Sequence, residues 1–251
     1  MPANILYYVK EEANPDLTAY CEELLQVRPI YELPEDIGDT LVLQADREGL
    51  ALVKNGREYR CDFTKNLPRT VPNNLNGELL IKATRFRNST GALSAVDATA
   101  GLGEDSFLLA AAGFQVMLFE KDPVIALLLH DALQRGRENL NLSPILSRME
   151  LRIEDSVNAM KNLDISPDIV LLDPMFPQRQ KSSLIKKKFQ LLHLLENPCN
   201  NEEELLSAAM ACNPKRIVIK RPSKGAYLAD KKPSYSIKGD SIRYDCIVCR
   251  S

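Results

Sequence analysis

Short apolar runs alternate with helical segments along the second half of the chain, from about Ala95 onward. This alternation is typical of a parallel β-sheet that is covered by helices on both faces. The predicted strands are residues 94–99, 114–120, 149–155, 167–173 and 215–220, and the predicted helices are residues 104–112, 123–140, 182–196 and 201–212.

The two ends of the chain follow other patterns. Residues 234–249, SYSIKGDSIRYDCIVC, are typical of two strands joined by a Gly-Asp turn, which predicts an antiparallel hairpin at one end of the sheet. The first 90 or so residues mix short β-like runs with turn residues. We therefore expect a small N-terminal α+β subdomain (residues 1–72) and a Rossmann-like α/β domain (residues 73–251). Five parallel strands and a terminal hairpin are the usual plan of a class I S-adenosylmethionine-dependent methyltransferase.

Composition narrows the class of protein further. With 251 residues and 45% hydrophobic content, the chain is long enough for one large domain and a small appendage. No apolar run approaches the roughly 18 residues that span a bilayer, and the N-terminus lacks the layout of a secretory signal, so we expect a cytoplasmic protein with no membrane partner. Cys246 and Cys249 lie three apart on a predicted strand and so point to opposite faces, which argues against a metal site.

Charge is distributed unevenly along the chain, although the net charge is only −2. Residues 1–58 hold 12 acids and 5 bases, whereas residues 178–195 hold 5 bases and no acid. Residues 214–238 add 8 bases against 1 acid. Such lysines commonly form solvated helix faces, but two basic clusters on either side of a candidate catalytic loop favour a nucleic-acid partner.

The first chemical motif is the turn in VDATAGLGED, where a strand that carries Asp97 leads through Gly101 and Gly103 into a helix. Glycines at such a turn let the backbone approach a bound nucleoside closely. Ser106 stands where the third glycine of a dinucleotide fingerprint would fall, so a dinucleotide enzyme is not favoured. Glu120 ends the next strand, where a carboxylate can accept hydrogen bonds from both ribose hydroxyls of an adenosine-type cofactor.

Four further polar residues lie at the expected carboxyl edge of the sheet. Glu104 and Asp105 either face the ammonium of the cofactor or simply complement the positive end of their helix. Asp155 and Ser156 either hydrogen-bond the adenine or cap the helix that follows them.

The stretch LLDPMFP ends the fourth strand, where ligands gather in open α/β sheets. Pro174 restricts Asp173, and Pro177 restricts Phe176, so the loop is held rather rigid. Asp173 and the Pro174 carbonyl can accept the hydrogen bonds of an NH₂ group while Phe176 stacks on the ring that carries it. An exocyclic amine is a poor nucleophile, and a site of this kind would activate it mainly by positioning and electrostatics.

This loop resembles the (D/N)-P-P-(F/Y) loop of amino-methylating nucleic-acid methyltransferases, with Met175 in place of the second proline. Together with DATAGLGED, QKSSLIKKK and VIKRP, it resembles the RsmJ family of 16S ribosomal RNA guanine-N2 methyltransferases, specifically over residues 73–238. The resemblance implies that S-adenosylmethionine is held by Glu104 with Asp105, Glu120 with Lys121, Asp155 with Ser156, and Asp173.

The residues that bind RNA are predicted from charge alone. Phosphate contacts are the natural use of basic side chains beside the loop and after the fifth strand. These are Lys181, Lys186, Lys187, Lys188, Lys220, Arg221 and Lys224. We therefore expect a methyltransferase for the N2 amine of a guanine in 16S rRNA or the small ribosomal subunit, with no prediction of the oligomeric state. Two alternatives stay open, a methyltransferase for another amine (DNA adenine or protein glutamine) and a non-catalytic RNA-binding protein.

Overall fold

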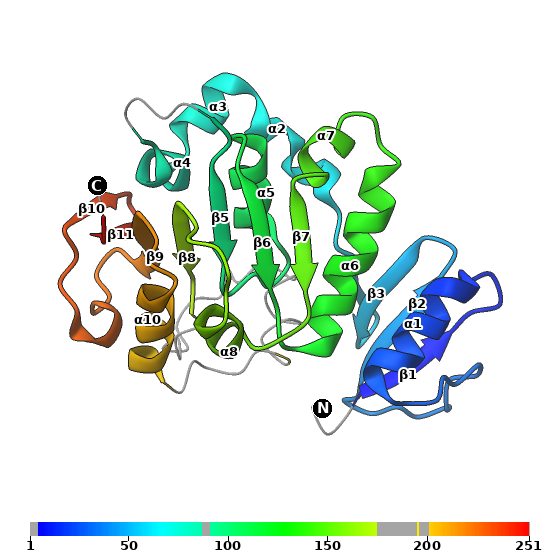
Figure 1. Cartoon of the computed structure of the whole chain (residues 1–251). Coiled ribbons are helices and arrows are strands. Elements are labelled where there is room, and N and C mark those ends of the chain that lie inside the picture. Colours follow the sequence, from blue (N-terminus) through cyan, green and yellow to red (C-terminus); the bar gives the residue numbers. More distant parts are fainter. Residues whose placement is uncertain (1–4, 87–90, 175–194, 196–200, 251) are drawn as a thin grey trace.

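A seven-stranded sheet lies at the centre of the protein, in a computed structural model that describes residues 5–86, 91–174, 195 and 201–250 (Figure 1). The strand order is β10-β11-β9-β8-β5-β6-β7. The first five strands in sequence are parallel, and the two at the end form the predicted antiparallel hairpin beside β9. The predicted class I fold is confirmed. The strands are β5 (Ser94–Asp97), β6 (Gln115–Phe119), β7 (Met149–Arg152), β8 (Ile169–Leu172), β9 (Arg216–Pro222), β10 (Tyr235–Lys238) and β11 (Ile242–Val248).

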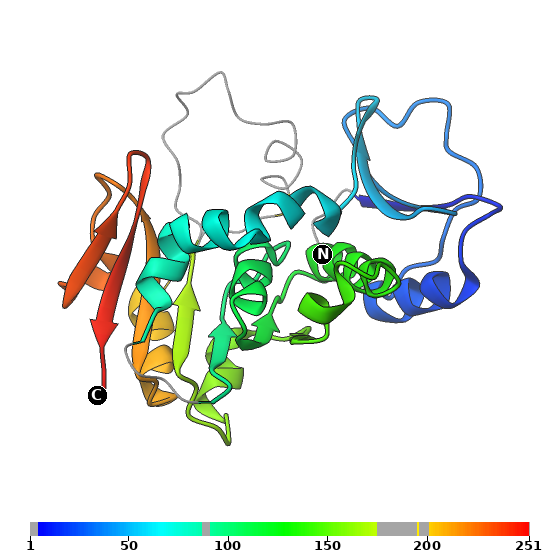
Figure 2. The ribbon, with the colours of Figure 1, turned by 90° about the horizontal axis from the view of Figure 1, so that it is seen from above.

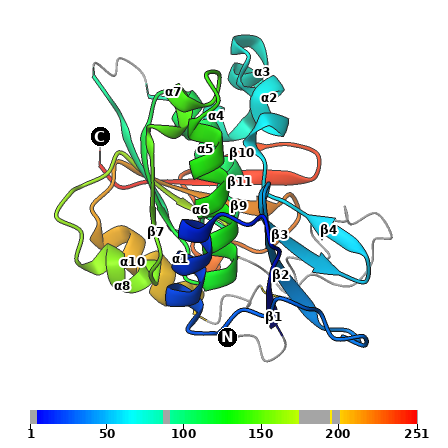
Figure 3. The same ribbon diagram turned by 90° about the vertical axis from the view of Figure 1, so that its right-hand side faces the viewer.

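Helices cover both faces of this sheet, which explains why its strands read as continuous apolar runs. In β8, Ile169 and Leu171 pack with the helices on one face, whereas Val170 and Leu172 belong to a second core on the other. Figure 3 shows the two helical layers on either side of the sheet. One layer holds α4 (Leu79–Thr84), α5 (Glu104–Ala111), α6 (Pro123–Arg137) and α7 (Ser143–Leu146), and the other holds α8 (Ser156–Lys161) and α10 (Glu202–Ala211).

The ends of these helices follow from local capping. Asp122 accepts hydrogen bonds from the backbone N–H groups of Val124 and Ile125, and Pro123 occupies the first position of α6. Helix α6 ends at Arg137, three residues earlier than predicted. The predicted helix at 182–196 lies outside the described residues except for Leu195, which is buried. Among the helices of the described ranges, none has the length and apolar character needed to cross a membrane.

The N-terminal α+β piece is a four-stranded sheet with one helix, as expected. Strands β1 (Ile5–Val9) and β2 (Leu41–Asp46) are parallel, whereas β3 (Gly49–Lys54) and β4 (Arg57–Tyr59) follow in antiparallel pairing. Helix α1 (Pro15–Leu25) packs against α6, and so does β3. The small sheet is thus docked on a helix of the large domain.

An ion pair with a buried carboxylate lies at this contact. The Asp131 carboxylate, on α6, accepts hydrogen bonds from the Leu50 N–H (3.0 Å) and from Arg135 Nε (2.9 Å). Arg135 also donates to the Cys61 carbonyl at 2.7 Å. Gly49 has φ +105°, and a Cβ there would lie 2.5 Å from Asp131, so only glycine lets β3 approach α6 this closely.

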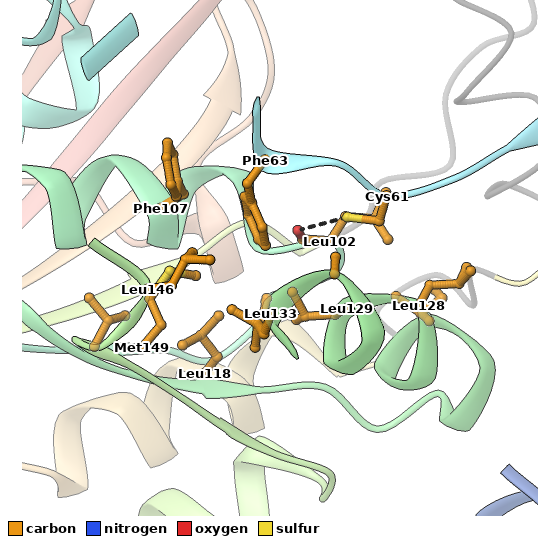
Figure 4. Close-up of a cluster of buried hydrophobic side chains, with 14 of the residues drawn as sticks. Cys61, Phe63, Leu102, Phe107, Leu118, Leu128, Leu129, Leu133, Leu146 and Met149 are labelled. Carbon is orange, nitrogen blue, oxygen red and sulfur yellow. Dashed lines mark hydrogen bonds between the residues drawn. The ribbon is translucent and has the colours of Figure 1, made fainter. Parts of the chain in front are cut away.

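Short helices connect the two parts of the protein, and they were not predicted. They are η1 (Phe63–Asn66), α2 (Leu67–Thr70), α3 (Pro72–Gly77) and α4, and in Figure 2 the last three run in cyan from the N-terminal sheet toward the terminal hairpin. Phe63 stacks on Phe107 of α5 with ring centroids 5.1 Å apart, and Cys61 Sγ lies 3.9 Å from the Leu102 carbonyl (Figure 4). The subdomain boundary at residue 72 falls within this connection and stays a prediction.

Candidate active site

Asp97, the last residue of β5, holds the loop that follows this strand. This carboxylate is buried and accepts hydrogen bonds from the Ser106 hydroxyl (2.6 Å) and the Thr99 N–H (3.1 Å). Burial raises its pKa to about 7, although both hydrogen bonds oppose the shift. Asp97 therefore ties the end of β5 to the start of α5, and its predicted contact with a cofactor stays a prediction.

The two glycines of the loop have different surroundings. Both have left-handed φ values, +54° at Gly101 and +72° at Gly103. A Cβ on Gly101 would meet no atom of the described residues within 4 Å, so among them this side of the loop is open to a ligand. A Cβ on Gly103 would instead lie 2.9 Å from Leu129 of α6, inside the core.

Replacing Gly103 by alanine should therefore weaken folding. An alanine in the left-handed region costs about 1–2 kcal/mol, in addition to the crowding against Leu129. We expect the free energy of unfolding in urea to fall by more than this amount, because the crowding adds to the backbone strain. Gly38→Ala is the control for backbone strain alone, because its φ is +50° and a Cβ there meets nothing within 4 Å. Equal losses in the two variants would contradict a packing role for Gly103.

Glu120 connects the tip of β6 to the glycine loop. Its Oε2 accepts the Gly101 N–H at 3.0 Å, and its Oε1 accepts the Asp122 N–H at 2.8 Å. Burial raises the pKa of this carboxyl to about 7. Each carboxylate oxygen accepts more than one hydrogen bond, so ribose hydroxyls can be accepted in addition to these two N–H groups.

The structure brings Lys121 and Asp155 together from the ends of β6 and β7. Lys121 Nζ lies 3.6 Å from Asp155 Oδ2 in an exposed ion pair. Asp155 also caps α8, since it accepts hydrogen bonds from the N–H groups of Val157 and Asn158, and Ser156 is the first residue of that helix. The capping interpretation of Asp155 is therefore correct, and a contact with adenine stays a prediction.

The strongest electrostatic feature of the site joins three elements. Lys220 Nζ, on β9, lies 2.8 Å from Asp105 Oδ2 on α5 and 2.8 Å from Asp173 Oδ2 after β8. Burial lowers the pKa of Lys220, but the two carboxylates outweigh burial and raise it overall. Burial raises the pKa of Asp173 in spite of the ammonium beside it. The Asp173 N–H donates to the Thr99 hydroxyl at 2.6 Å, so its backbone is anchored as well.

Two of the cations predicted to bind phosphate have partners inside the protein. The Lys220 side chain is 26% exposed and is neutralised by two carboxylates. The Arg221 side chain is 4% exposed, lies 3.4 Å from Glu202 and donates to the Ala226 carbonyl. Their positions do not support direct phosphate contacts, because both groups are engaged inside the protein. Lys224 is exposed as predicted, and Phe176, Lys181, Lys186, Lys187 and Lys188 lie outside the described residues.

Several residues near the site were not predicted from the sequence. Thr99 and Ser106 lie in or beside the glycine motif, and their hydroxyls were a signal that we did not use. Tyr244, on β11, is buried, and burial together with the charge of Asp105 raises its pKa in spite of Lys220. Arg69 forms a bidentate pair with Glu78 (2.8 and 3.0 Å) beside an open cavity of about 530 Å³ between α2 and α4.

These features fit S-adenosylmethionine. Gly101 leaves an open approach to the backbone, and the half-buried Glu120 carboxylate lies against the same turn, where ribose hydroxyls need an acceptor. Asp105 faces the same edge of the sheet and supplies negative charge for an ammonium group. Within residues 5–86, 91–174 and 201–250, no group of three His, Cys, Asp or Glu side chains has the arrangement of a metal site.

Comparison with known proteins agrees with this geometry. A family model described as "Putative SAM-dependent methyltransferase" matches residues 27–249. The chain is 36% identical over 244 residues to ribosomal RNA small subunit methyltransferase J of Thioalkalivibrio sulfidiphilus, covering 94% of this chain and 95% of that protein. The protein of the same name from Marinobacter nauticus is also 36% identical, covering 87% and 81%. A crystal structure of the SAM-dependent methyltransferase NGO1261 from Neisseria gonorrhoeae is similar with a TM-score of 0.78 and 30% identity, covering 97% and 95%.

Proposed function

Because this chain belongs to the S-adenosylmethionine-dependent methyltransferase family that includes the ribosomal RNA small subunit methyltransferase J proteins, we propose that it methylates 16S rRNA. We propose further that the methyl acceptor is the exocyclic N2 amine of a guanine. The observation that carries this proposal is the anchored carboxylate of Asp173 at the end of β8, followed directly by the buried Pro174. Such a carboxylate suits an NH₂ group, whose protons need acceptors.

The cofactor side of the site is assigned from the loop and strand ends. When bound, S-adenosylmethionine supplies an electrophilic methyl group on a sulfonium centre. Glu120 would accept hydrogen bonds from the ribose, and Gly101 would let the nucleoside approach the turn. Asp155, with Lys121 beside it, would border the adenine. Asp97 would act as a positioning residue, because its oxygens hold Ser106 and Thr99.

The amine side is assigned from the loop after β8. Lys220 is bound to Asp173 Oδ2, which leaves Oδ1 to accept a hydrogen bond from the amine. The Pro174 carbonyl would be the second acceptor, and Phe176 would stack on the base. Two acceptors and one stacked ring orient the nitrogen lone pair, so positioning and electrostatics lower the barrier. The nitrogen loses its proton only after the new N–C bond has made it cationic.

A labelled-methyl transfer assay tests the proposal directly. Purified protein and labelled S-adenosylmethionine are offered 16S rRNA, small ribosomal subunits, DNA and total protein. We expect label in the rRNA, as N2-methylguanine after nuclease digestion and chromatography. Label in DNA adenine or protein glutamine would show that the methyl acceptor is another amine. Cofactor binding without any transfer would favour a non-catalytic RNA-binding protein.

The lysines at positions 186–188, which follow the predicted catalytic loop in sequence, should contribute to RNA affinity through phosphate contacts. Each contact releases condensed counterions, so log K should fall by about 0.7–0.9 per unit of log salt for each one. Consecutive helical residues point about 100° apart, so we expect only one or two of Lys186, Lys187 and Lys188 to touch RNA. The triple alanine variant should bind RNA more weakly at low salt, with a slope shallower by roughly one to two units.

The matched control for this variant is Lys161→Ala. Lys161 lies in the last turn of α8 and pairs with Glu204 at 2.9 Å, so its removal also deletes an exposed lysine. Filter-binding measurements from low to high salt should give the parental slope for the control. A parental slope in the triple variant would mean that these three lysines are only solvated, and would move the test to Lys181 and to Lys224, which is the exposed one of the predicted cations within the described residues.

A further inference from the structure

One ammonium group is shared by two carboxylates from different halves of the site. Lys220 reaches Asp105 and Asp173 at the same distance, 2.8 Å, although these residues come from α5 and from the loop after β8. Asp105 belongs to the helix that follows the glycine loop, and Asp173 to the loop that would hold the amine. Lys220 therefore links the cofactor side to the acceptor side.

The surroundings of Asp173 make this link electrostatically necessary. Asp105 on α5 and Asp97 on β5 both repel a charged Asp173. Tyr244 on β11 adds a buried hydroxyl, whose pKa is raised by burial and by the charges of Asp105 and Asp173. Arg221 contributes a positive charge from further along β9, and Lys220 is the cation in hydrogen-bonding contact with the carboxylate. Removing that contact would leave Asp173 near the carboxyl groups of Asp105 and Asp97 without the ammonium of Lys220.

We propose that Lys220 is a positioning residue for methyl transfer, which keeps Asp173 ionised and fixes its Oδ2 so that Oδ1 faces the acceptor amine. This inference rests on the proposed function. It differs from the predicted role of Lys220 in binding phosphate, because the ammonium acts on Asp173 and not on the RNA. It also differs from a purely structural ion pair, which would change stability without changing the pH dependence of the reaction.

The variants that test the proposal are Lys220→Met, which removes the charge and keeps the aliphatic stem, and Lys220→Arg, which keeps the charge. Lys215→Met is the matched control, since Lys215 precedes β9 and pairs with Asp168 at 2.7 Å near the opposite edge of the sheet. Single-turnover rates are measured against pH at saturating cofactor, so that titration of Glu120 does not contribute. The rate should rise with pH as Asp173 loses its proton, because the carboxylate is the form that accepts a hydrogen bond.

In Lys220→Met this rise should move to higher pH by about 1–3 units, the usual effect of losing an opposite charge in contact with a carboxylate. At a pH below this shifted rise, the rate of Lys220→Met should be at least tenfold lower than that of the parent, since the ionised fraction of a carboxyl falls tenfold per pH unit below its pKa. In Lys220→Arg the rate should rise over the same pH range as in the parent, even if the rate itself is lower. Lys215→Met should match the parent in both the rate and its pH dependence. If the rate of Lys220→Met rises over the same pH range as that of the parent, with or without a uniformly lower rate, the proposal is overturned.

A second measurement needs no RNA and separates this inference from the proposed function. Unfolding in urea is followed for the cofactor-free parent, for Lys220→Met, for Asp173→Asn and for the double variant. Asp173→Asn should destabilise the parent, which loses an ion pair, but should stabilise the Lys220→Met protein, which loses a repulsion with Asp105. If the effects of Lys220→Met and Asp173→Asn on the free energy of unfolding simply add in the double variant, the two residues are not coupled and the proposal is overturned. If the coupling is present but no rRNA is methylated, the proposed function fails and Lys220 is reduced to a structural ion pair.

Discussion

Replacing Asp173 by alanine or asparagine should reduce the rate of methyl transfer by about 10²–10³-fold, the range for loss of one preorganised hydrogen-bonding group in an active site. The carboxylate is anchored through its backbone by Thr99 and through Oδ2 by Lys220, so its free oxygen is a fixed acceptor. An asparagine keeps the shape of the side chain but loses the charge and one acceptor. The rate loss should exceed any loss in cofactor affinity.

Single-turnover rates with saturating cofactor and rRNA measure this effect. Asp164→Asn is the control, because Asp164 is exposed in the segment between α8 and β8. We expect the parental rate and the parental S-adenosylmethionine affinity from the control, and in the Asp173 variants a loss of affinity by calorimetry that is smaller than the loss of rate. Parental rates in both Asp173 variants would exclude Asp173 from holding the amine.

Glu120→Ala should weaken S-adenosylmethionine binding by about 1.5–3 kcal/mol, the range for hydrogen bonds to a charged group. This corresponds to roughly a tenfold to hundredfold rise in Kd. The half-buried carboxylate lies against Gly101, so its loss removes both the ribose acceptor and a support of the turn. Isothermal calorimetry measures the change, and Glu138→Ala, an exposed acid at the end of α6, should leave Kd unaltered. An unchanged Kd for Glu120→Ala would remove Glu120 from the cofactor site.

The same carboxylate should make cofactor binding pH-dependent. Burial raises the pKa of Glu120 to about 7 in the free protein, and ribose hydroxyls bind the ionised form. Protons and cofactor therefore compete, and affinity should fall as the pH drops through about 7. Glu120→Ala should lose this dependence, which calorimetry at several pH values would detect. Persistence of the parental pH profile in that variant would assign the titration to another group.

The sequence by itself determined the large domain, because its signals are local. Each parallel strand is an apolar run buried on both faces, and each helix between strands has its own caps or turn residues. Asp97, Gly101, Glu120, Asp155 and Asp173 could be placed at one edge for the same reason. The carboxyl ends of parallel strands always meet there.

The N-terminal part was predicted less completely. Its sheet was expected, but the helices between residues 63 and 84 were not, because they are short and are held by contacts with one another, with α5 and α6, and with the strands β9 to β11. Phe63 and Gly49 acquire their roles only where the chain meets Phe107 and Asp131. Periodicity within one segment contains no information about such partners.

Only the tertiary structure decided what the charged residues of β9 do. A basic run beside a catalytic loop predicted phosphate contacts, yet Lys220 pairs with residues 115 and 47 positions away, and Arg221 is buried against Glu202. The physical reason is that burying a charge is costly unless it is paired, so the fold decides which cations are neutralised inside and which remain in solvent. Lys224, four residues after Lys220, is exposed, and the sequence pattern does not distinguish between the two.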